Sequence, residues 1–307
     1  MHSRLSRQTK VIGKIKGTIA IVGLGALGSV AANLLARSGI NLILIDRDII
    51  ELSNLQRQLY NEDQINQSKA IATKNNLTKI NSKIKLTPLA IHLNQKNIKL
   101  LKKVDIILDC TDNLQTRFLI NDYAKKNNIP WIYSAAIKTS GYVMPILPKK
   151  NYPCLSCFLK PANLETCETQ GVLNTITNAI ASIQTTLAIK ILKKEPTPPN
   201  LYHLNIYKPE LKTIHIKQNK NCPTCNKQYN YLNQKQKPIK FCQSSRYQFK
   251  TNLTLKQIKE KLKHLKPIED EVSIQTKNLI AFKDKRILIK AKDEKQAQSI
   301  LSKLIGN

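Results

Sequence analysis

The chain has 307 residues, 41% of them hydrophobic, which suffices for one large α/β domain and a small second unit. No apolar run approaches the roughly 18–20 residues of a membrane helix, so we expect no membrane span. The net charge of +30 invites a nucleic-acid partner, but only eight of the 50 basic residues are Arg, and Lys is spread over the whole chain. We therefore favour a solvated, Lys-rich surface over nucleic-acid binding; such a surface could steer ATP or an acidic protein.

The cysteines indicate a reducing compartment. Seven Cys cannot all pair into disulfides, and four stand as two Cys-x-x-Cys pairs, Cys154/Cys157 and Cys222/Cys225. This spacing is typical of metal ligands rather than of a secreted disulfide scaffold. The first 17 residues are basic but lack the apolar stretch of a secretory signal. We expect a cytoplasmic protein, with an organellar transit peptide as the alternative.

The first half of the chain alternates strand-like and helix-like segments. Short apolar runs predict buried strands at residues 18–22, 41–45, 84–87, 104–108, 130–135 and 142–147. Helical patterns follow three of these strands and end near Ser38, Lys79 and Lys126. This alternation predicts an α/β fold with a Rossmann-like, doubly wound, mostly parallel sheet.

Beyond Cys157 the pattern changes. A polar loop at 163–170 precedes a long apolar helix at 172–192 and a strand pair at 201–207 and 211–216. A Lys/Gln/Asn-rich stretch at 226–240 is typical of a linker. It is followed by a helix at 255–265, a hairpin at 279–289 and a last helix at 293–304. We therefore divide the chain into a main domain, a linker and a small α+β appendage of unknown role, at residues 1–225, 226–240 and 241–307.

A glycine loop, Gly23-x-Gly25-x-x-Gly28, lies between the first strand and the first helix. Gly23 permits the tight turn, Gly25 lets a phosphate approach the backbone, and Gly28 allows close helix–strand packing. The helix N-terminus attracts an anion, and Asp46, after the second strand, can bond ribose hydroxyls. NAD and ATP fit this loop equally well, and glycines present only for packing are the remaining alternative.

Polar groups after the second and fourth strands favour ATP. They are Asp46, Asp48, Asn54, Arg57, Gln58, Lys69, Asp109, Asp112 and Asn113. Arg and Lys can neutralise a triphosphate, and an Asp can hold Mg²⁺. An NAD-dependent oxidoreductase would instead need a His or Tyr acid–base group, and no His stands in such a context. Taken alone, each of these residues has a simpler explanation. Arg57 or Lys69 could be a surface charge, and Asp112 with Asn113 could cap the next helix.

Together these segments resemble the ThiF/MoeB/HesA-type adenylyltransferases. This family activates ubiquitin-like sulfur carriers for molybdopterin and thiamine synthesis and is related to the adenylation domains of ubiquitin-activating enzymes. The resemblance covers roughly residues 4–225 and is most specific at 53–58 (Ser-Asn-Leu-Gln-Arg-Gln) and 109–113 (Asp-Cys-Thr-Asp-Asn). It implies ATP-dependent adenylylation of the C-terminal glycine carboxylate of a small carrier protein ending in Gly-Gly, with release of pyrophosphate.

The resemblance also implies roles for individual residues. Asp46 would bind ribose and Asp112 would hold Mg²⁺, while the phosphates would be held by Asn54, Arg57 and Lys69. Arg7 resembles an arginine that reaches into the partner subunit's ATP site, which implies a homodimer. Cys167 stands where some relatives form a covalent adduct with the carrier.

The two cysteine pairs fit the structural zinc of the family. The resemblance implies a four-thiolate Zn²⁺ site made of Cys154, Cys157, Cys222 and Cys225, with redox dithiols as the alternative. The appendage does not look like the sulfurtransferase domain of some relatives, so sulfur transfer would need a separate protein. An NAD-dependent oxidoreductase and an inactive carrier-binding scaffold remain as alternative functions. Retention of Arg57, Lys69 and Asp112 argues against the scaffold.

Overall fold

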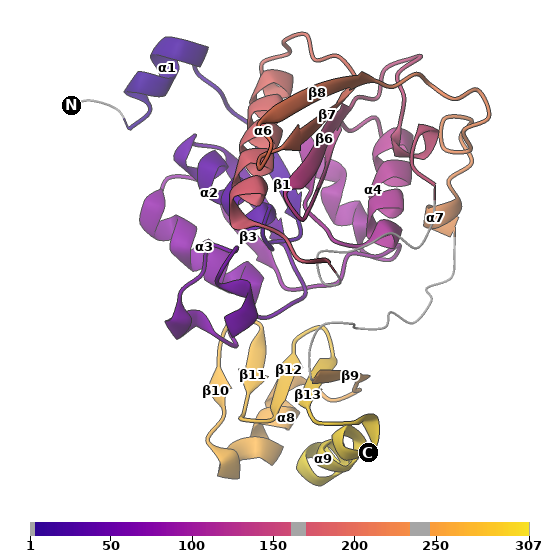
Figure 1. Cartoon of the computed structure of the whole chain (residues 1–307). Coiled ribbons are helices and arrows are strands. Elements are labelled where there is room, and N and C mark those ends of the chain that lie inside the picture. The colour runs from indigo at the N-terminus through magenta and orange to yellow at the C-terminus, as the bar shows by residue number, and fades with distance from the viewer. Residues whose placement is uncertain (1–3, 161–169, 234–245, 307) are drawn as a thin grey trace. The chain divides into compact units, whose positions relative to one another are not determined.

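The computed structural model describes residues 4–160, 170–233 and 246–306. The chain divides into two compact units, Met1–Gln236 and Lys237–Asn307 (Figure 1). None of the described helices is long and apolar enough to cross a membrane.

The first unit is built on an eight-stranded sheet with the strand order β3-β2-β1-β4-β5-β6-β7-β8. Its strands are β1 (Thr18–Val22), β2 (Asn41–Ile45), β3 (Leu86–Leu89), β4 (Ile106–Asp109), β5 (Trp131–Ile137), β6 (Ser140–Ile146), β7 (Asn200–Asn205) and β8 (Glu210–His215). The strands from β3 to β5 are parallel, and β6, β7 and β8 continue the sheet antiparallel. The predicted mixed α/β fold with a large, mostly parallel sheet is thereby confirmed.

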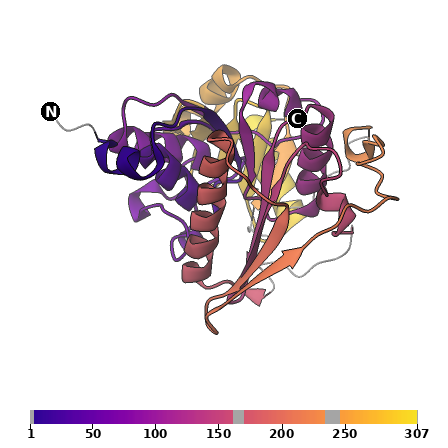
Figure 2. The ribbon, with the colours of Figure 1, turned by 90° about the horizontal axis from the view of Figure 1, so that it is seen from above.

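Helices cover both faces of this sheet (Figure 2). The described helices of the unit are α1 (Ser6–Ile12), α2 (Gly28–Arg37), α3 (Lys69–Ile80), α4 (Leu114–Lys126), α6 (Asn174–Leu192) and α7 (Asn230–Asn233). Helix α2 packs between α3 and α6 on one face, and α4 lies on the other face with α7 against it. The central strands are therefore buried on both sides, which explains their continuous apolar runs.

Several boundaries differ from the sequence prediction by one to three residues, and two of these differences have a local reason. Strand β3 begins at Leu86 rather than at residue 84, because Lys85 donates its N–H to the Asn41 side chain (2.8 Å) and not to the backbone of a neighbouring strand. Helix α6 begins at Asn174 rather than at residue 172, because Leu173 still donates its N–H to the carbonyl of Lys138 (2.9 Å). Of the predicted linker, residues 230–233 form helix α7.

The second unit contains a five-stranded antiparallel sheet in the order β10-β11-β12-β13-β9. Its elements are β9 (Arg246–Lys250), α8 (Leu255–Leu262), β10 (Ile268–Glu269), β11 (Ser273–Gln275), β12 (Leu279–Phe282), β13 (Arg286–Lys290) and α9 (Glu294–Ile305). Both helices pack on the sheet through a core that includes Ile258, Leu262, Ile287 and Ala297. The two helices and the β12–β13 hairpin follow the sequence prediction; β9, β10 and β11 do not appear in it.

Candidate nucleotide site and cysteine cluster

The glycine loop is packed so closely that two of its glycines cannot be replaced without movement. Gly23 has φ +89°, and a Cβ at this position would lie 2.6 Å from the carbonyl oxygen of Cys110. A Cβ at Gly28 would lie 1.8 Å from the carbonyl oxygen of Gly23. A Cβ at Gly25 would meet only Gln58 Nε2, at 3.7 Å. The space beside Gly25 is therefore open, as a phosphate-binding loop requires.

Asp46 joins the glycine loop to the end of β2. Its Oδ2 accepts the N–H of Leu24 at 2.6 Å, and its Oδ1 accepts the N–H of Asp48 at 2.8 Å. The side chain is almost fully buried, and burial raises the pKa of this carboxyl above its ordinary value, while the charge of Lys69 acts in the opposite direction. Each oxygen keeps a second lone pair, so this carboxylate can still accept a ribose hydroxyl.

The chain after β2 folds back onto the loop. Lys69, the first residue of α3, is buried and donates its backbone N–H to the carbonyl of Asp48 (3.0 Å). Tyr60, which the sequence prediction missed, donates its hydroxyl to the carbonyl of Leu24 (2.8 Å) and lies 3.0 Å from Thr73 Oγ1. Tyr60 and Asp46 therefore hold the carbonyl and the N–H of the same residue, Leu24. The sequence signal for Tyr60 is no more than an aromatic residue in a polar segment.

Asn54, Arg57 and Gln58 occupy the same segment. Asn54 is buried and accepts the N–H of Glu51 (3.2 Å), and Arg57 donates Nη1 to the carbonyl of Ser53 (2.9 Å). Gln58 is also buried, yet its Oε1 has no hydrogen-bond partner among the described residues. A buried amide oxygen without a partner is costly, so this atom marks a place where a ligand group or water would be bound.

The segment after β4, residues 110–113, is held in place by contacts among Asp109, Thr111 and Arg117. Asp109 is completely buried; its Oδ1 accepts the N–H (3.0 Å) and the hydroxyl (2.6 Å) of Thr111, and its Oδ2 lies 3.4 Å from Arg117 Nε. Arg117 also donates Nη2 to the carbonyl of Thr111 and lies over the ring of Tyr133. Burial raises the pKa of Asp109, and the Arg117 charge opposes this shift. Arg117 was not predicted from the sequence.

Asp112 and Asn113 follow this held segment. Asp112 is exposed, whereas Asn113 is the N-cap of α4 and accepts the N–H of Thr116 at 2.8 Å. The helix-cap explanation therefore holds for the side-chain oxygen of Asn113. Asp112 keeps its carboxylate at the surface, directly before the helix.

The predicted nucleotide residues gather at one edge of the sheet. Val22 is in register with Ile45 on one side and with Asp109 on the other, so the glycine loop, Asp46 and the 110–113 segment all leave the sheet side by side. This is the edge at which open α/β sheets bind ligands.

Two predicted residues lie elsewhere. Arg7 is exposed on α1. The next residue, Gln8, donates Nε2 to the carbonyl of Ser38 (3.3 Å), which lies at the C-terminal end of α2, away from the glycine loop. Helix α2 is about 15 Å long, so Arg7 does not belong to the site of its own chain. Cys167 lies outside the described residues.

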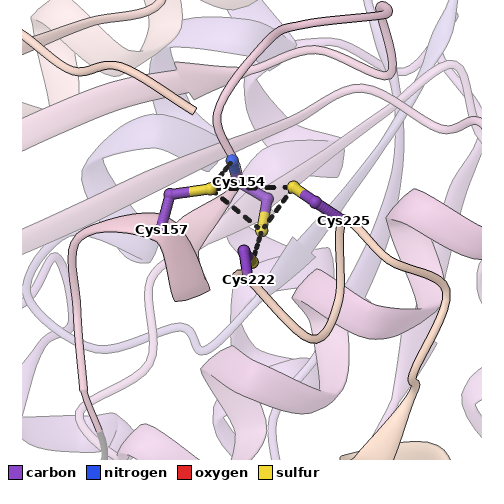
Figure 3. Close-up of side chains that lie close together, drawn as sticks. All are labelled: Cys154, Cys157, Cys222 and Cys225. Atoms are coloured by element: carbon purple, nitrogen blue, oxygen red, sulfur yellow. Dashed lines mark hydrogen bonds between the residues drawn. The ribbon is translucent and has the colours of Figure 1, made fainter. Parts of the chain in front are cut away.

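The four paired cysteines form one cluster (Figure 3). Their Sγ atoms all lie within 4.8 Å of one another. The closest sulfur pairs are 3.5 Å apart for Cys154–Cys222 and 3.6 Å for both Cys157–Cys225 and Cys154–Cys225. Corners of a tetrahedron with metal–sulfur bonds of about 2.3 Å lie about 3.8 Å apart. Hydrogen bonds among the sulfurs lower the pKa of Cys157 and raise that of Cys154. The cluster is thus capable of binding a metal.

Helix α4 supports this cluster with two buried residues that the sequence prediction missed. Asn121 accepts the N–H of Leu155 (2.9 Å) and donates Nδ2 towards Cys154 Sγ (3.6 Å). Asp122 accepts the hydroxyl of Thr224 (2.7 Å) and the N–H of Tyr231 (2.8 Å). Burial raises the pKa of Asp122. Groups that hydrogen-bond to metal ligands and their loops in this way orient the ligands.

A glycine loop, a buried acid and the nearby charge of Lys69 at the carboxyl ends of parallel strands are typical of nucleotide-binding enzymes. Relatives named adenylyltransferases give the enzyme class. Residues 8–224 match the model of the ThiF family, and the chain belongs to this family. The prediction of family and enzyme class is confirmed.

Named relatives agree with this assignment. The chain is 33% identical over 310 residues to the sulfur carrier protein ThiS adenylyltransferase of Bacillus subtilis, covering 93% of this chain and 92% of the relative. It is 32% identical over 214 residues to the molybdopterin-synthase adenylyltransferase of Escherichia coli, covering 67% and 86%. The fold is similar to that of E. coli MccB with ATP, with TM-score 0.64, 24% identity, and coverage of 73% of this chain and 75% of that one.

Proposed function

We propose that this protein binds ATP with Mg²⁺ at the carboxyl edge of its Rossmann-like sheet and adenylylates the C-terminal glycine carboxylate of a small ubiquitin-like sulfur carrier. The observation that supports this most is the meeting of Asp46, the glycine loop and the 110–113 segment at adjacent strand ends. The products are the acyl-adenylate of the carrier and pyrophosphate.

Each residue of the proposed site has a role in binding the ribose, the phosphates or Mg²⁺. Asp46 binds the ribose, and Asp48 orders that carboxylate by donating its N–H to Oδ1. The phosphates lie over Gly25 and the α2 N-terminus, where charge and amide donors come from Asn54, Arg57, Gln58 and Lys69. Asp112 would hold Mg²⁺ beside Asn113, where the metal would supply positive charge that neutralises the phosphates.

The reaction needs positioning more than proton transfer. A carboxylate at the end of the carrier tail is already ionised, so its attack on the α-phosphorus requires no general base. The charge that develops at the phosphorus is met by Arg57 and Lys69, and by Arg7 of the partner subunit in a homodimer with two composite sites.

The carrier is of the ThiS type or of the molybdopterin-synthase type. The Bacillus subtilis relative named for ThiS aligns with 93% of this chain, so the alignment includes most of residues 237–307. The E. coli relatives named for ThiS and for molybdopterin synthase both align with 67%, so coverage does not separate the two carriers. Sulfur transfer onto the activated carrier is left to a separate sulfurtransferase, and Cys167 is a candidate for a covalent adduct with the carrier.

The four cysteines hold a structural Zn²⁺. With four thiolates as ligands, a tetrahedral Zn²⁺ would have no open position for a water or substrate. Such a metal would fasten Cys222 and Cys225, which precede α7, to the segment after β6. A reducing cytoplasm suits such a site.

ATP–pyrophosphate exchange tests the proposal. The purified protein should exchange label only when ATP, Mg²⁺ and a carrier ending in Gly-Gly, of the ThiS or the molybdopterin-synthase type, are all present, and Asp112→Ala should abolish the exchange. Asp63→Ala, which removes an exposed carboxylate outside the site, should leave it unchanged. Tight NAD binding without exchange would restore the oxidoreductase alternative, and carrier binding without exchange would favour an inactive scaffold.

A further inference from the structure

Gln184 is a completely buried polar side chain to which the proposed adenylylation assigns no role. It lies on α6, which packs against β4 and β5. Its Nε2 donates to the carbonyl of Asp109 (3.1 Å) and to the carbonyl of Ile132 (3.2 Å), and its Oε1 accepts the S–H of Cys110 (3.3 Å). These hydrogen bonds go to the last residue of β4, to the residue that follows it and to the second residue of the neighbouring strand β5.

The two carbonyls lie where β4 and β5 stop pairing with each other. Strands β4 and β5 are in register at Ile107↔Trp131 and Leu108↔Ile132, and no further pair of these two strands follows. The amide of Gln184 takes the place of the next rung of the ladder, because one NH₂ group spans both carbonyls. Ser134 adds its hydroxyl to the same Asp109 carbonyl (2.7 Å). The point at which β4 leaves the sheet is thus fixed by side chains.

The segment that ends in Asp112 begins directly after this point. Cys110 donates its N–H to the carbonyl of Val22 (2.9 Å), directly before the glycine loop. A Cβ at Gly28 would lie 3.3 Å from the Cβ of Cys110. Cys110 is therefore wedged between Gln184 and the glycine loop, and a shift of Gln184 would move both sides of the nucleotide site relative to each other.

We propose that Gln184 is a positioning residue for adenylylation, which sets the place of Asp112 relative to the glycine loop without touching ATP. The inference rests on the proposed function, because it assigns Asp112 to the nucleotide's Mg²⁺. Misplacement of a reacting or charge-bearing group by about 1 Å can cost up to about 100-fold in rate. We expect Gln184→Met, which keeps the volume and removes both donors, to act in this way.

Calorimetric titration with ATP, in the absence and presence of Mg²⁺ and without any carrier, gives a readout separate from turnover. In the wild type, Mg²⁺ should increase the affinity for ATP. In Gln184→Met this Mg²⁺-dependent increase in affinity, the Mg²⁺ gain, should be about tenfold smaller, while the affinity for ATP without Mg²⁺ changes little. The matched control is Thr177→Val on the same helix, which removes the buried hydrogen bond to the Asn174 carbonyl (2.7 Å) far from the strand ends. Thr177→Val should retain the full Mg²⁺ gain in ATP affinity.

Ser134→Ala serves as a second test variant if Gln184→Met does not fold, because it removes only one donor to the Asp109 carbonyl. It should reduce the Mg²⁺ gain in the same direction and by less. An unchanged gain in Gln184→Met, or in Ser134→Ala if the former does not fold, would overturn the inference. If the wild type itself shows no carrier-dependent exchange, the proposed function fails; if it exchanges normally and the variants bind ATP as it does, only the role of Gln184 fails.

Discussion

The carboxylate of Asp46 accepts the backbone N–H of Leu24 at 2.6 Å, which fastens the end of β2 to the middle of the glycine loop. In the proposed site, one residue thereby shapes the loop that would receive the phosphates and presents the carboxylate that would bind the ribose. Tyr60 holds the carbonyl of the same Leu24, so both polar backbone groups of this residue are fixed by side chains that follow β2.

The pH dependence of stability should report the buried Asp46. Burial raises its pKa above the ordinary 3.8, so ionisation is harder in the folded state than in the unfolded state. Its contribution is fully present below 3.8 and is lost as the pH rises through the folded pKa. Relative to the wild type, Asp46→Asn should therefore gain free energy of unfolding as the pH rises above 3.8 in urea titrations.

The same variant should bind ATP more weakly at every pH, because the amide offers one acceptor oxygen where the carboxylate offers two. Asp63→Asn, at an exposed position, should show neither effect. A wild-type stability that rises relative to Asp46→Asn with increasing pH would contradict the assignment.

The glycine loop offers a pair of matched substitutions. Gly28→Ala places a Cβ against the carbonyl of Gly23 and should lower the free energy of unfolding by about 1–3 kcal/mol or more. Gly25→Ala meets no atom closer than 3.7 Å, so it should unfold like the wild type but bind ATP at least about tenfold more weakly. Denaturant melts and ATP titrations on both variants separate packing from phosphate access. Equal ATP affinity for Gly25→Ala and wild type would remove Gly25 from the site.

Complementation between inactive variants should reveal the composite site. Arg7→Ala and Asp112→Ala should each abolish pyrophosphate exchange, since every site lacks one group. After subunit exchange, half of the dimers carry both variants and one intact site, so activity should return to about a quarter of the wild-type value. No recovery, despite mixed dimers seen by native mass spectrometry, would place Arg7 outside the partner's site.

Removal of one cysteine should empty the metal site. Cys225→Ser leaves three thiolates, so bound zinc measured by elemental analysis should fall from about one per chain to near zero, and the melting temperature should fall with it. Cys110→Ala removes a cysteine outside the cluster and should keep the metal. Full zinc content in Cys225→Ser would show that the cluster is not the binding site.

The central strands and the site loops could be predicted because their signals are local. β1 and β2 are uninterrupted apolar runs that coincide with residues 18–22 and 41–45, and the polar groups follow them directly. Strand β10 has only two residues, both exposed, so it leaves no periodic pattern. It exists through pairing with β11.

The supporting residues could not be predicted for a different reason. Asn121, Asp122 and Gln184 are polar residues inside helices, where such residues normally face water. Each is completely buried because a partner distant in sequence approaches it: Leu155 for Asn121, Thr224 for Asp122 and Asp109 for Gln184. Nothing in the local pattern distinguishes these residues from a solvated face.

Helix α4 is anchored at two points along its length. Asn113 caps it beside Asp112, and two turns later Asn121 meets the segment of Cys154. Successive residues of an α-helix are rotated by about 100°, so inserting or deleting one residue between these points would turn Asn121 and Asp122 out of the core. The number of residues from Asn113 to Asn121 should therefore be invariant among functional variants, whereas the surface loops elsewhere can change length freely.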